Sequence, residues 1–137
     1  MIKKFLIINL FLFSFFLTNS YSDNNTYMSL KNNKVNVRYG PGLDYPIKFV
    51  FNKKNYPVEI IDQKENFRKI LDFKKNSGWI HRSQLKKSSS FITLDTAILF
   101  SDSTKFSRPI AKIESGRLLN KKKCNLNWCR VETGEYK

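Results

Sequence analysis

The residues able to carry out acid–base or metal chemistry are few and scattered in this 137-residue sequence. His81 is the only histidine, and a catalytic histidine needs positioned partners. Spacing leaves a serine–histidine–acid set open, because such partners meet only in the fold, but His81 is better explained as a strand-end side chain. Asp44 and Asp102 fall in turn-like segments, where aspartate caps backbone groups. With no phosphate-binding glycine loop or metal-ligand cluster in the sequence, we expect no enzymatic activity, no metal and no cofactor.

Cys124 and Cys129 are the only cysteines. Zinc would need further cysteine or histidine ligands, and the spacing is not that of a Cys-x-x-Cys redox pair. Residues 121–123 and 128–131 are predicted to be the arms of a hairpin with its turn at 125–127, which brings cysteines on facing arms within bridging distance. We therefore expect a disulfide that pins the hairpin more than it stabilises the whole domain, with a zinc or redox site as the alternative.

The first residues have the pattern of a secretory signal. Lys3 and Lys4 form a positive start, and Phe5–Leu17 is an apolar run shorter than the ~20 residues a spanning helix needs. Small residues near Ser22 favour cleavage there, so 1–22 is predicted to be a signal peptide, and an uncleaved membrane anchor is the alternative. No cysteine lies near this site, which argues against a lipoprotein. We expect an exported protein, on the periplasmic or cell-wall side, that touches the membrane only through this segment if it is uncleaved.

The charge is strongly basic. The net charge is +14, and removing residues 1–22, which hold two lysines and no acids, lowers it to +12. A nucleotide-composition bias that favours lysine, asparagine, isoleucine and phenylalanine would produce the same excess, so the charge need not be selected for a partner. Lysine pairs at 53–54, 74–75 and 86–87 and the triplet 121–123 fall in or beside turns, where charge is usually only solvated. Export argues further against nucleic acid as the partner.

Short apolar segments separated by turn signals predict an all-β protein. Residues 23–33 are expected to be a loose polar lead-in, and no helical period stands out before Ser90. The predicted strands are 35–38, 47–51, 57–62, 67–73 and 79–81, and the predicted core residues are Val35, Val37, Ile47, Phe49, Val58, Ile60, Phe67, Ile70 and Ile80.

Two motifs in this series carry a family resemblance. Val35–Gly42 has the sequence Val-Asn-Val-Arg-Tyr-Gly-Pro-Gly, a strand that stops at a glycine–proline turn. About forty residues later Ser77–His81 has Ser-Gly-Trp-Ile-His, a turn into a strand with a large aromatic residue. Together these motifs resemble the bacterial SH3-like (SH3b) domain of exported proteins. The resemblance implies a small SH3-like β-barrel over residues 30–86.

The pattern then restarts after a polar segment, 86–90, that is predicted to be a linker. Residues 97–100 parallel 35–38, residues 108–113 parallel 45–50, and residues 128–131 parallel 67–70. We therefore expect a tandem repeat, with a second SH3-like barrel at 91–137. Its own Gly-Trp-Ile would fall just beyond Lys137, so either the sequence given is truncated there or this barrel lacks its last strand, which would expose an edge prone to pairing.

The resemblance also implies a ligand groove beside the long loop that follows the first strand. The residues that would form it are Arg38, Tyr39, Asp44, Tyr45 and Trp79. Aromatic rings suit extended peptides, and arginine is a bidentate donor for carboxylates. Three of these residues also have a purely structural alternative, because Trp79 can be core or half-core, Tyr45 can pack on Pro46, and Arg38 can be the solvent face of its strand.

The sequence suggests three alternative functions. The first is a non-catalytic module that binds a cell-envelope polymer or protein, and the resemblance implies peptidoglycan peptides as its ligand. The second is a scaffold that docks another envelope protein without a small ligand. The third is a basic surface that attracts anionic polymers, including nucleic acid. We take the first as the main hypothesis.

Overall fold

The computed structural model describes residues 26–134. Strands form nearly all of its regular structure, so the all-β expectation is confirmed. The predicted signal peptide, residues 1–22, lies outside the described range. Between residues 26 and 134 no helix has the length and apolar character needed to cross a membrane.

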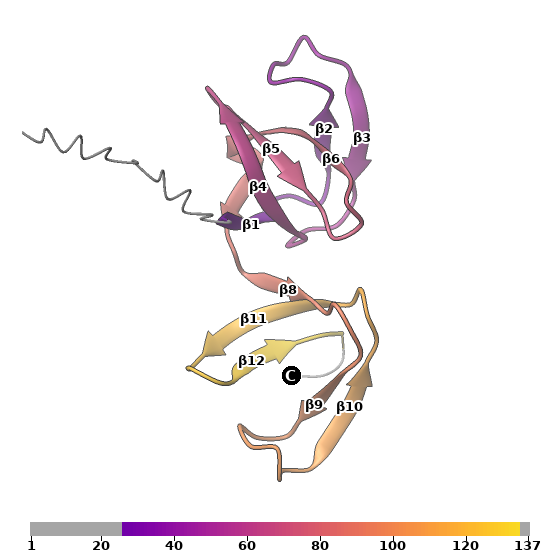
Figure 1. Cartoon of the computed structure of the whole chain (residues 1–137), viewed down its shortest axis with the longest axis vertical. Coiled ribbons are helices and arrows are strands. Elements are labelled where there is room, and N and C mark those ends of the chain that lie inside the picture. Colours follow the sequence, from indigo (N-terminus) through magenta and orange to yellow (C-terminus); the bar gives the residue numbers. More distant parts are fainter. Residues whose placement is uncertain (1–25, 135–137) are drawn as a thin grey trace, which may run out of the picture.

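Twelve strands and one short 3₁₀ helix follow one another within residues 26–134 (Figure 1). They are β1 (Thr26–Leu30), β2 (Val35–Arg38), β3 (Ile47–Phe51), β4 (Pro57–Lys64), β5 (Phe67–Leu71), β6 (Ser77–His81), η1 (Arg82–Gln84), β7 (Leu85–Lys87), β8 (Ser90–Ile92), β9 (Ala97–Phe100), β10 (Pro109–Ile113), β11 (Leu118–Cys124) and β12 (Cys129–Glu132). We call residues 26–87 the N-terminal unit and residues 90–134 the C-terminal unit.

The N-terminal unit is one antiparallel sheet with strand order β3-β2-β6-β5-β4-β1-β7. The sheet therefore ends at β3 and β7, and the described pairings do not close it into the barrel that the resemblance implies. The glycine of the Gly-Trp motif is needed where β6 meets β2. A Cβ added at Gly78 would lie 2.4 Å from a methyl carbon of Val37 and 3.0 Å from the Arg38 carbonyl oxygen, so only glycine lets the two strands approach.

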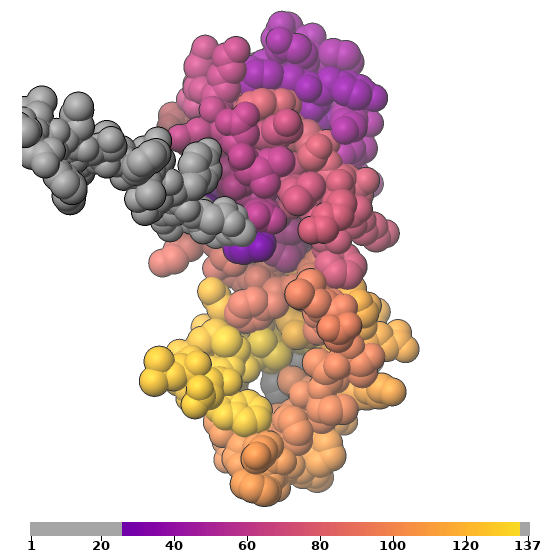
Figure 2. Space-filling model, in the orientation of Figure 1, coloured from indigo at the N-terminus to yellow at the C-terminus, as the bar shows by residue number. Residues whose placement is uncertain are grey.

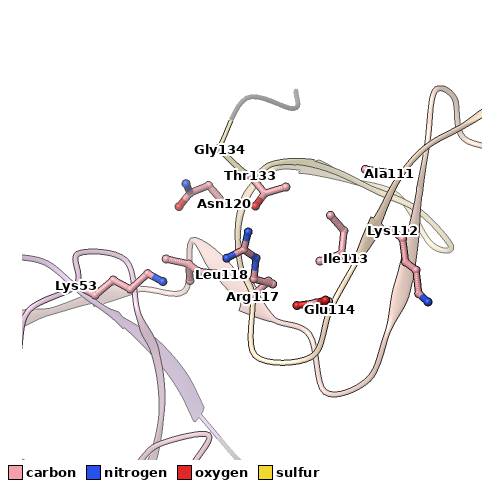
Figure 3. A pocket seen from close by; sticks show the side chains of 10 residues that line it. All are labelled: Lys53, Ala111, Lys112, Ile113, Glu114, Arg117, Leu118, Asn120, Thr133 and Gly134. Atoms are coloured by element: carbon pink, nitrogen blue, oxygen red, sulfur yellow. The ribbon is translucent and has the colours of Figure 1, made fainter.

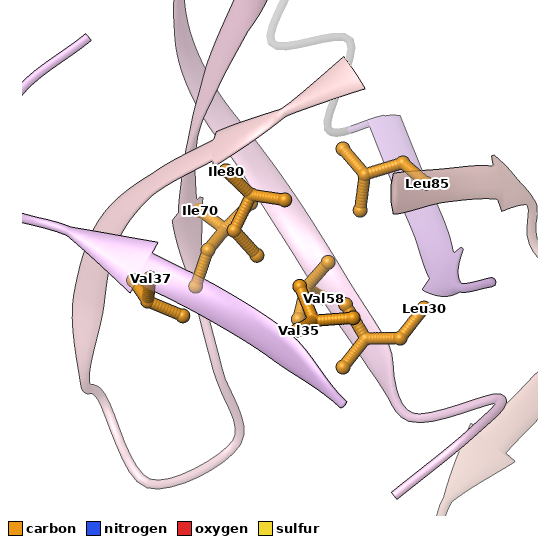
Figure 4. Close-up of a cluster of buried hydrophobic side chains, with 7 residues drawn as sticks. All are labelled: Leu30, Val35, Val37, Val58, Ile70, Ile80 and Leu85. Atoms are coloured by element: carbon orange, nitrogen blue, oxygen red, sulfur yellow. The ribbon is translucent and has the colours of Figure 1, made fainter. Parts of the chain in front are cut away.

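One face of this sheet carries the hydrophobic core (Figure 4). Val35 and Val37 are buried while Asn36 between them is exposed, which confirms the alternation expected of a half-buried strand. The buried cluster consists of Leu30, Val35, Val37, Val58, Ile70, Ile80 and Leu85. Ile47, which the sequence placed in the core, is 46% exposed and begins β3, which is an edge strand of the sheet.

Two segments predicted to be loose are strands. Residues 26–30, within the expected lead-in, form β1, which pairs with both β4 and β7 and buries Ser29 and Leu30. The expected linker 86–90 includes the end of β7 and the start of β8. These polar residues can be buried because the Ser29 and Ser90 hydroxyls hydrogen-bond each other at 3.0 Å and Ser89 N–H donates to Ser29 Oγ at 3.1 Å. Composition alone does not reveal such paired serines.

The C-terminal unit forms two smaller sheets, with strand orders β10-β9 and β12-β11-β8. β9 pairs with β10 as β2 pairs with β3, and β11 lies between β8 and β12 as β4 lies between β1 and β5. The turns that precede β4 and β11 each contain a residue with positive φ, 64° at Asn55 and 78° at Gly116. As in the N-terminal unit, no sheet of the described residues closes into a barrel.

Candidate functional site

The loop that follows β2 is held by its own backbone and by Arg38. Tyr39 N–H donates to the Pro46 carbonyl at 3.2 Å across the base of the loop. The Arg38 guanidinium donates to the Tyr45 carbonyl at 2.7 Å. Arg38 is therefore a brace for the loop rather than a side chain that only faces solvent. The loop lies at the end of the N-terminal unit that points away from the C-terminal unit (Figures 1 and 2).

The Tyr45 ring packs against the glycine turn. A Cβ added at Gly40 would lie 2.2 Å from two carbons of that ring, so the ring occupies the space that any larger residue at this position would need. Gly40 is buried, whereas Tyr45 keeps 42% of its surface exposed. The ring thus covers the turn with one side and leaves the rest to solvent. Asp44 is exposed on the same loop, with its carboxylate directed back towards Gly42.

Trp79 lies on the outer face of the sheet, next to Arg38. Arg38 and Trp79 are directly opposite each other on β2 and β6, and Trp79 is opposite Lys69 on β5. Residues directly opposite on paired strands share a face, so the three side chains form a row across the sheet. Trp79 is half-buried, and the core position of this strand belongs to the neighbouring Ile80. Trp79 is therefore outside the buried core cluster, and its half-buried position agrees with the half-core alternative.

Two further residues of this region, Lys48 and Leu43, were not predicted from the sequence. Lys48 Nζ lies 5.7 Å from the centre of the Tyr39 ring and donates to the Ser77 carbonyl at 2.9 Å, so it connects the loop to β6. Leu43 is 72% exposed on the same loop as Tyr39, which is 63% exposed. Leu43 had a usable signal, because an apolar residue between turn residues has no strand neighbour to cover it. Lys48 had none, since its role depends on the position of β6.

The structure therefore brings some of the predicted site residues together and leaves others apart. Arg38 is the common neighbour of Tyr45, through a hydrogen bond, and of Trp79, through strand pairing. Tyr39 joins the same region through Lys48 and Ser77. Asp44 has no described contact with Arg38 or Trp79 and stays at the edge of this surface. We call Arg38, Tyr39, Leu43, Tyr45 and Trp79 the loop surface.

His81 ends β6 and caps the 3₁₀ helix that follows. Its Nδ1 lies 2.7 Å from Ser83 Oγ and accepts from Ser83 N–H at 3.3 Å, while its ring meets the Phe67 ring edge-to-face at 5.2 Å. The imidazole thus has a capping role at the corner of the chain. Among residues 26–134 no group of three or more His, Cys, Asp or Glu side chains could hold a metal ion.

Cys124 and Cys129 form the expected disulfide. They are directly opposite each other where β11 and β12 meet, with their Cα atoms 4.0 Å apart. The turn between them is closed by the Asn125 side chain, which accepts from Asn127 N–H at 3.0 Å and from Trp128 N–H at 2.8 Å. The hairpin prediction is confirmed, because its signals are local in the chain.

One family model matches part of this chain. Residues 31–87 match the family model described as "Bacterial SH3 domain". The match supports the resemblance drawn from the two sequence motifs for this segment, which contains the whole loop surface. It does not extend to the C-terminal unit, so the expected tandem repeat is not established by it.

Among solved structures, the chain resembles the structure of NlpC1 from Trichomonas vaginalis. The two are 15% identical with a TM-score of 0.40, and the likeness covers 85% of this chain and 44% of the other. This chain therefore corresponds to less than half the length of that protein. No curated protein matches the sequence.

Proposed function

We propose that this protein is an exported, non-catalytic binding module whose loop surface engages a cell-envelope component, with peptidoglycan peptides as the first candidate ligand. The family match over residues 31–87 supports the class of module. Residues 1–22, with the pattern of a secretory signal, support a location on the periplasmic or cell-wall side.

The observation that carries the proposal is that exposed apolar side chains stand on a loop that is fixed in place. Tyr39, Leu43 and Tyr45 all keep much of their surface in solvent. The Arg38 hydrogen bond and the Tyr45–Gly40 packing hold the backbone that carries them. Apolar groups held in position before binding lose little conformational entropy when a ligand arrives, which favours binding by the exposed side chains of this loop.

The charges around the patch suit a peptide with free carboxylates. Arg38 uses one nitrogen on the Tyr45 carbonyl and keeps other N–H groups for a ligand. Lys69, the neighbour of Trp79 across the sheet, adds a second positive charge on the same face. An extended peptide could lie along the row of side chains with its apolar groups on the rings and a carboxylate at the basic residues.

We also propose that the C-terminal unit repeats the fold of the N-terminal unit. The matched order of strand pairs supports this, as do two matched bulges. One interrupts β2–β3 after Val37 and β9–β10 after Leu99, and the other interrupts β4–β5 after Ile60 and β11–β12 after Lys121. A bulge changes the direction of a strand at one position. Bulges at matching positions in the two units therefore favour the same fold for both.

Cosedimentation with purified peptidoglycan tests the proposed ligand. We expect the protein to be retained at physiological salt and retention to fall in Tyr45→Ala, which removes the ring that covers Gly40. The matched control is Tyr27→Ala, because Tyr27 is also an exposed tyrosine, at 54%, but lies on β1 away from the loop.

Equal retention of both variants and the unaltered protein would contradict a binding site on the loop. Retention that disappears with modest salt in every variant would indicate charge attraction alone, which is the basic-surface alternative. Tight binding to duplex DNA with a steep salt dependence would favour nucleic acid instead. Loss of retention in Tyr45→Ala alone supports the proposal.

A further inference from the structure

Two turns of the C-terminal unit each carry one apolar side chain that is almost wholly exposed. Phe106, in the loop that joins β9 to β10, is 89% exposed. Leu126, in the turn that joins β11 to β12, is fully exposed. A single exposed apolar residue is ordinary on a protein surface, so these two carry meaning only if they belong to one surface with a recognisable chemistry.

Hydrogen bonds within each turn fix the backbone beneath these side chains. Ser107 Oγ donates to the Thr104 carbonyl at 2.7 Å, and Phe106 N–H donates to Thr104 Oγ1 at 3.3 Å. The turn that carries Leu126 is closed by the disulfide and by the Asn125 side chain. Groups that are already held in position lose little conformational entropy on binding, so both turns are suited to inserting an apolar side chain into a partner.

The two turns belong to one side of the C-terminal unit. Phe100, the last residue of β9, and Trp128, which directly precedes β12, meet edge-to-face with their ring centroids 5.9 Å apart. Figure 1 shows the β11–β12 turn at the left of the unit and the β9–β10 loop at its lower end, and no segment of the described chain extends beyond the line that joins them. A flat surface can therefore touch both turns while the rest of the described chain stays on one side of it.

Basic side chains surround both turns. The segments 101–108 and 121–130 together hold six basic residues and one acid. Lys105 is exposed, and its ammonium lies 5.5 Å from the centre of the Phe106 ring. Arg130 is exposed on β12, next to the disulfide. The surface around the two apolar side chains is therefore positive and complements an anionic partner. We call Lys105, Phe106, Lys123, Leu126 and Arg130 the tip surface.

We propose that the tip surface binds an anionic lipid bilayer, with Phe106 and Leu126 inserted between the lipids and the basic side chains on the headgroup phosphates. The affinity of such a surface combines the apolar area that is buried with the attraction between basic residues and anionic lipids. The tip surface is separate from the loop surface. Binding there departs from the expectation that the protein touches the membrane only through residues 1–22.

The shape of the tip surface favours a bilayer over a protein partner. Its apolar side chains project singly from two turns, whereas a stable protein interface needs a continuous buried centre. A fluid bilayer accommodates each projection separately. The open hollow of about 830 Å³ shown in Figure 3 provides no groove here, because neither turn contributes to its lining. A second copy of the chain, with its net charge of +14, would bring like charges together.

The loop surface and the tip surface lie at different ends of the molecule. The loop after β2 is at the upper end of Figure 1, and the β9–β10 loop is at the lower end. A bilayer in contact with the tip surface therefore leaves the loop surface directed away from it. In this arrangement the protein would reach from a membrane towards the envelope component proposed above.

Vesicle cosedimentation tests the inference. The protein is residues 23–137, which contain every described strand, because the apolar residues 5–17 would bind vesicles on their own. The probes are vesicles of phosphatidylglycerol and phosphatidylcholine in equal parts, and vesicles of phosphatidylcholine alone. At physiological salt we expect binding to the anionic vesicles that is at least about tenfold tighter than binding to the neutral ones.

Single serine substitutions locate the contact. Leu126→Ser and Phe106→Ser are each expected to weaken binding to the anionic vesicles by about tenfold, because each removes apolar area that the bilayer would bury. The double variant should bind more weakly than either. Leu94→Ser is the matched control, since Leu94 is also an exposed leucine, at 73%, but lies before β9, at the other end of that strand from the loop. Circular dichroism verifies the fold of each variant.

Trp128 reports insertion. In Trp79→Phe it is the only tryptophan, and lipids brominated on the acyl chains should quench its fluorescence in anionic vesicles. Combining Trp79→Phe with the two serine substitutions should remove this quenching.

Tyr45→Ala is expected to bind the vesicles as the unaltered chain does, and the double serine variant to keep its retention on peptidoglycan, so the two proposals can fail separately. Absence of binding to the anionic vesicles, or an equal loss in Leu94→Ser, would overturn the inference. So would binding that persists in the double variant and disappears with modest salt, because charge alone would then hold the protein. Dimerisation that depends on Phe106 would make a second copy the occupant and also overturn it.

Discussion

Arg38 and Tyr45 together hold the loop after β2 in place. The Arg38 guanidinium donates to the Tyr45 carbonyl at 2.7 Å, and the Tyr45 ring packs over Gly40. The same arginine is the cross-strand neighbour of Trp79. One residue therefore ties the exposed rings of the loop to the Gly-Trp strand. This relationship links both sequence motifs to a single surface and underlies the predictions about binding.

Gly40→Ala is expected to displace the Tyr45 ring, because the added Cβ would lie 2.2 Å from two ring carbons. We expect a loss of about 1–3 kcal/mol in the free energy of unfolding, measured by urea denaturation, and weaker retention on peptidoglycan. In the double variant with Tyr45→Ala the clash is gone, so Gly40→Ala should then have little further effect on stability. Gly42→Ala is the matched control, since its nearest neighbour is the terminal oxygen of the Asp44 side chain, which can rotate away. Equal effects of the Gly40 change with and without Tyr45 would contradict this packing.

Ile80→Ala is expected to lower the free energy of unfolding by about 2–5 kcal/mol, because Ile80 is fully buried at the centre of the core. Ile98→Ala offers the matched comparison on β9. Ile98 is 48% exposed, so its truncation should change the stability by no more than about 0.5 kcal/mol. Thermal or urea unfolding of both variants measures the contrast, and similar losses would mean that the core is not confined to the cluster shown in Figure 4.

Ionisation of Tyr56 is expected to make the free energy of unfolding fall at alkaline pH. Burial, and secondarily the charge of Asp72, raise the pKa of the Tyr56 phenol above its ordinary value of 10.0. The unfolded chain therefore releases this proton first, so the contribution of neutral Tyr56 to stability is complete below pH 10 and is lost as the pH rises above it. Tyr56→Phe removes this loss. The drop in urea midpoint between about pH 9 and about pH 11 should be smaller in the variant; an identical drop would show that Tyr56 titrates alike in both states.

The disulfide is expected to stabilise the β11–β12 hairpin and little else. Replacing Cys124 and Cys129 together with serine removes a bridge over a very short loop, for which chain entropy predicts about 2 kcal/mol. Hydrogen exchange should speed up at Lys123 and Arg130 beside the bridge and stay unchanged at Ile70 in the N-terminal core. Faster exchange throughout both units would instead make the bridge a support of the whole protein.

Local signals in the sequence were sufficient for much of the fold. The Val35–Val37 alternation, the glycine–proline turn and the Cys124–Cys129 hairpin depend on residues close together in the chain, and each appears in the structure. Strand β1 was missed because its burial depends on a distant partner, the Ser90 hydroxyl that pairs with Ser29. The open ends of the N-terminal sheet were missed because closure depends on how the whole sheet curves.

The candidate site was predictable in its residue types but not in its geometry. The sequence suggested Arg38 as a ligand donor, yet its bond to the Tyr45 carbonyl depends on the path of the loop backbone. The position of Trp79 on the outer face followed only when the pairing of β6 with β2 and β5 was known. Lys48 shows the same limit, because its contact with Ser77 connects strands that are far apart in the sequence.

The most direct test of the central claim is an NMR titration of the isotopically labelled protein with soluble peptidoglycan fragments. Binding at the loop surface predicts saturable shifts in the backbone amides of the non-proline residues between 38 and 45 and in the indole N–H of Trp79, with the amides of β11 and β12 unmoved. Shifts that are absent, or that gather at the lysines of residues 121–123 and vanish with salt, would contradict a ligand site on the loop.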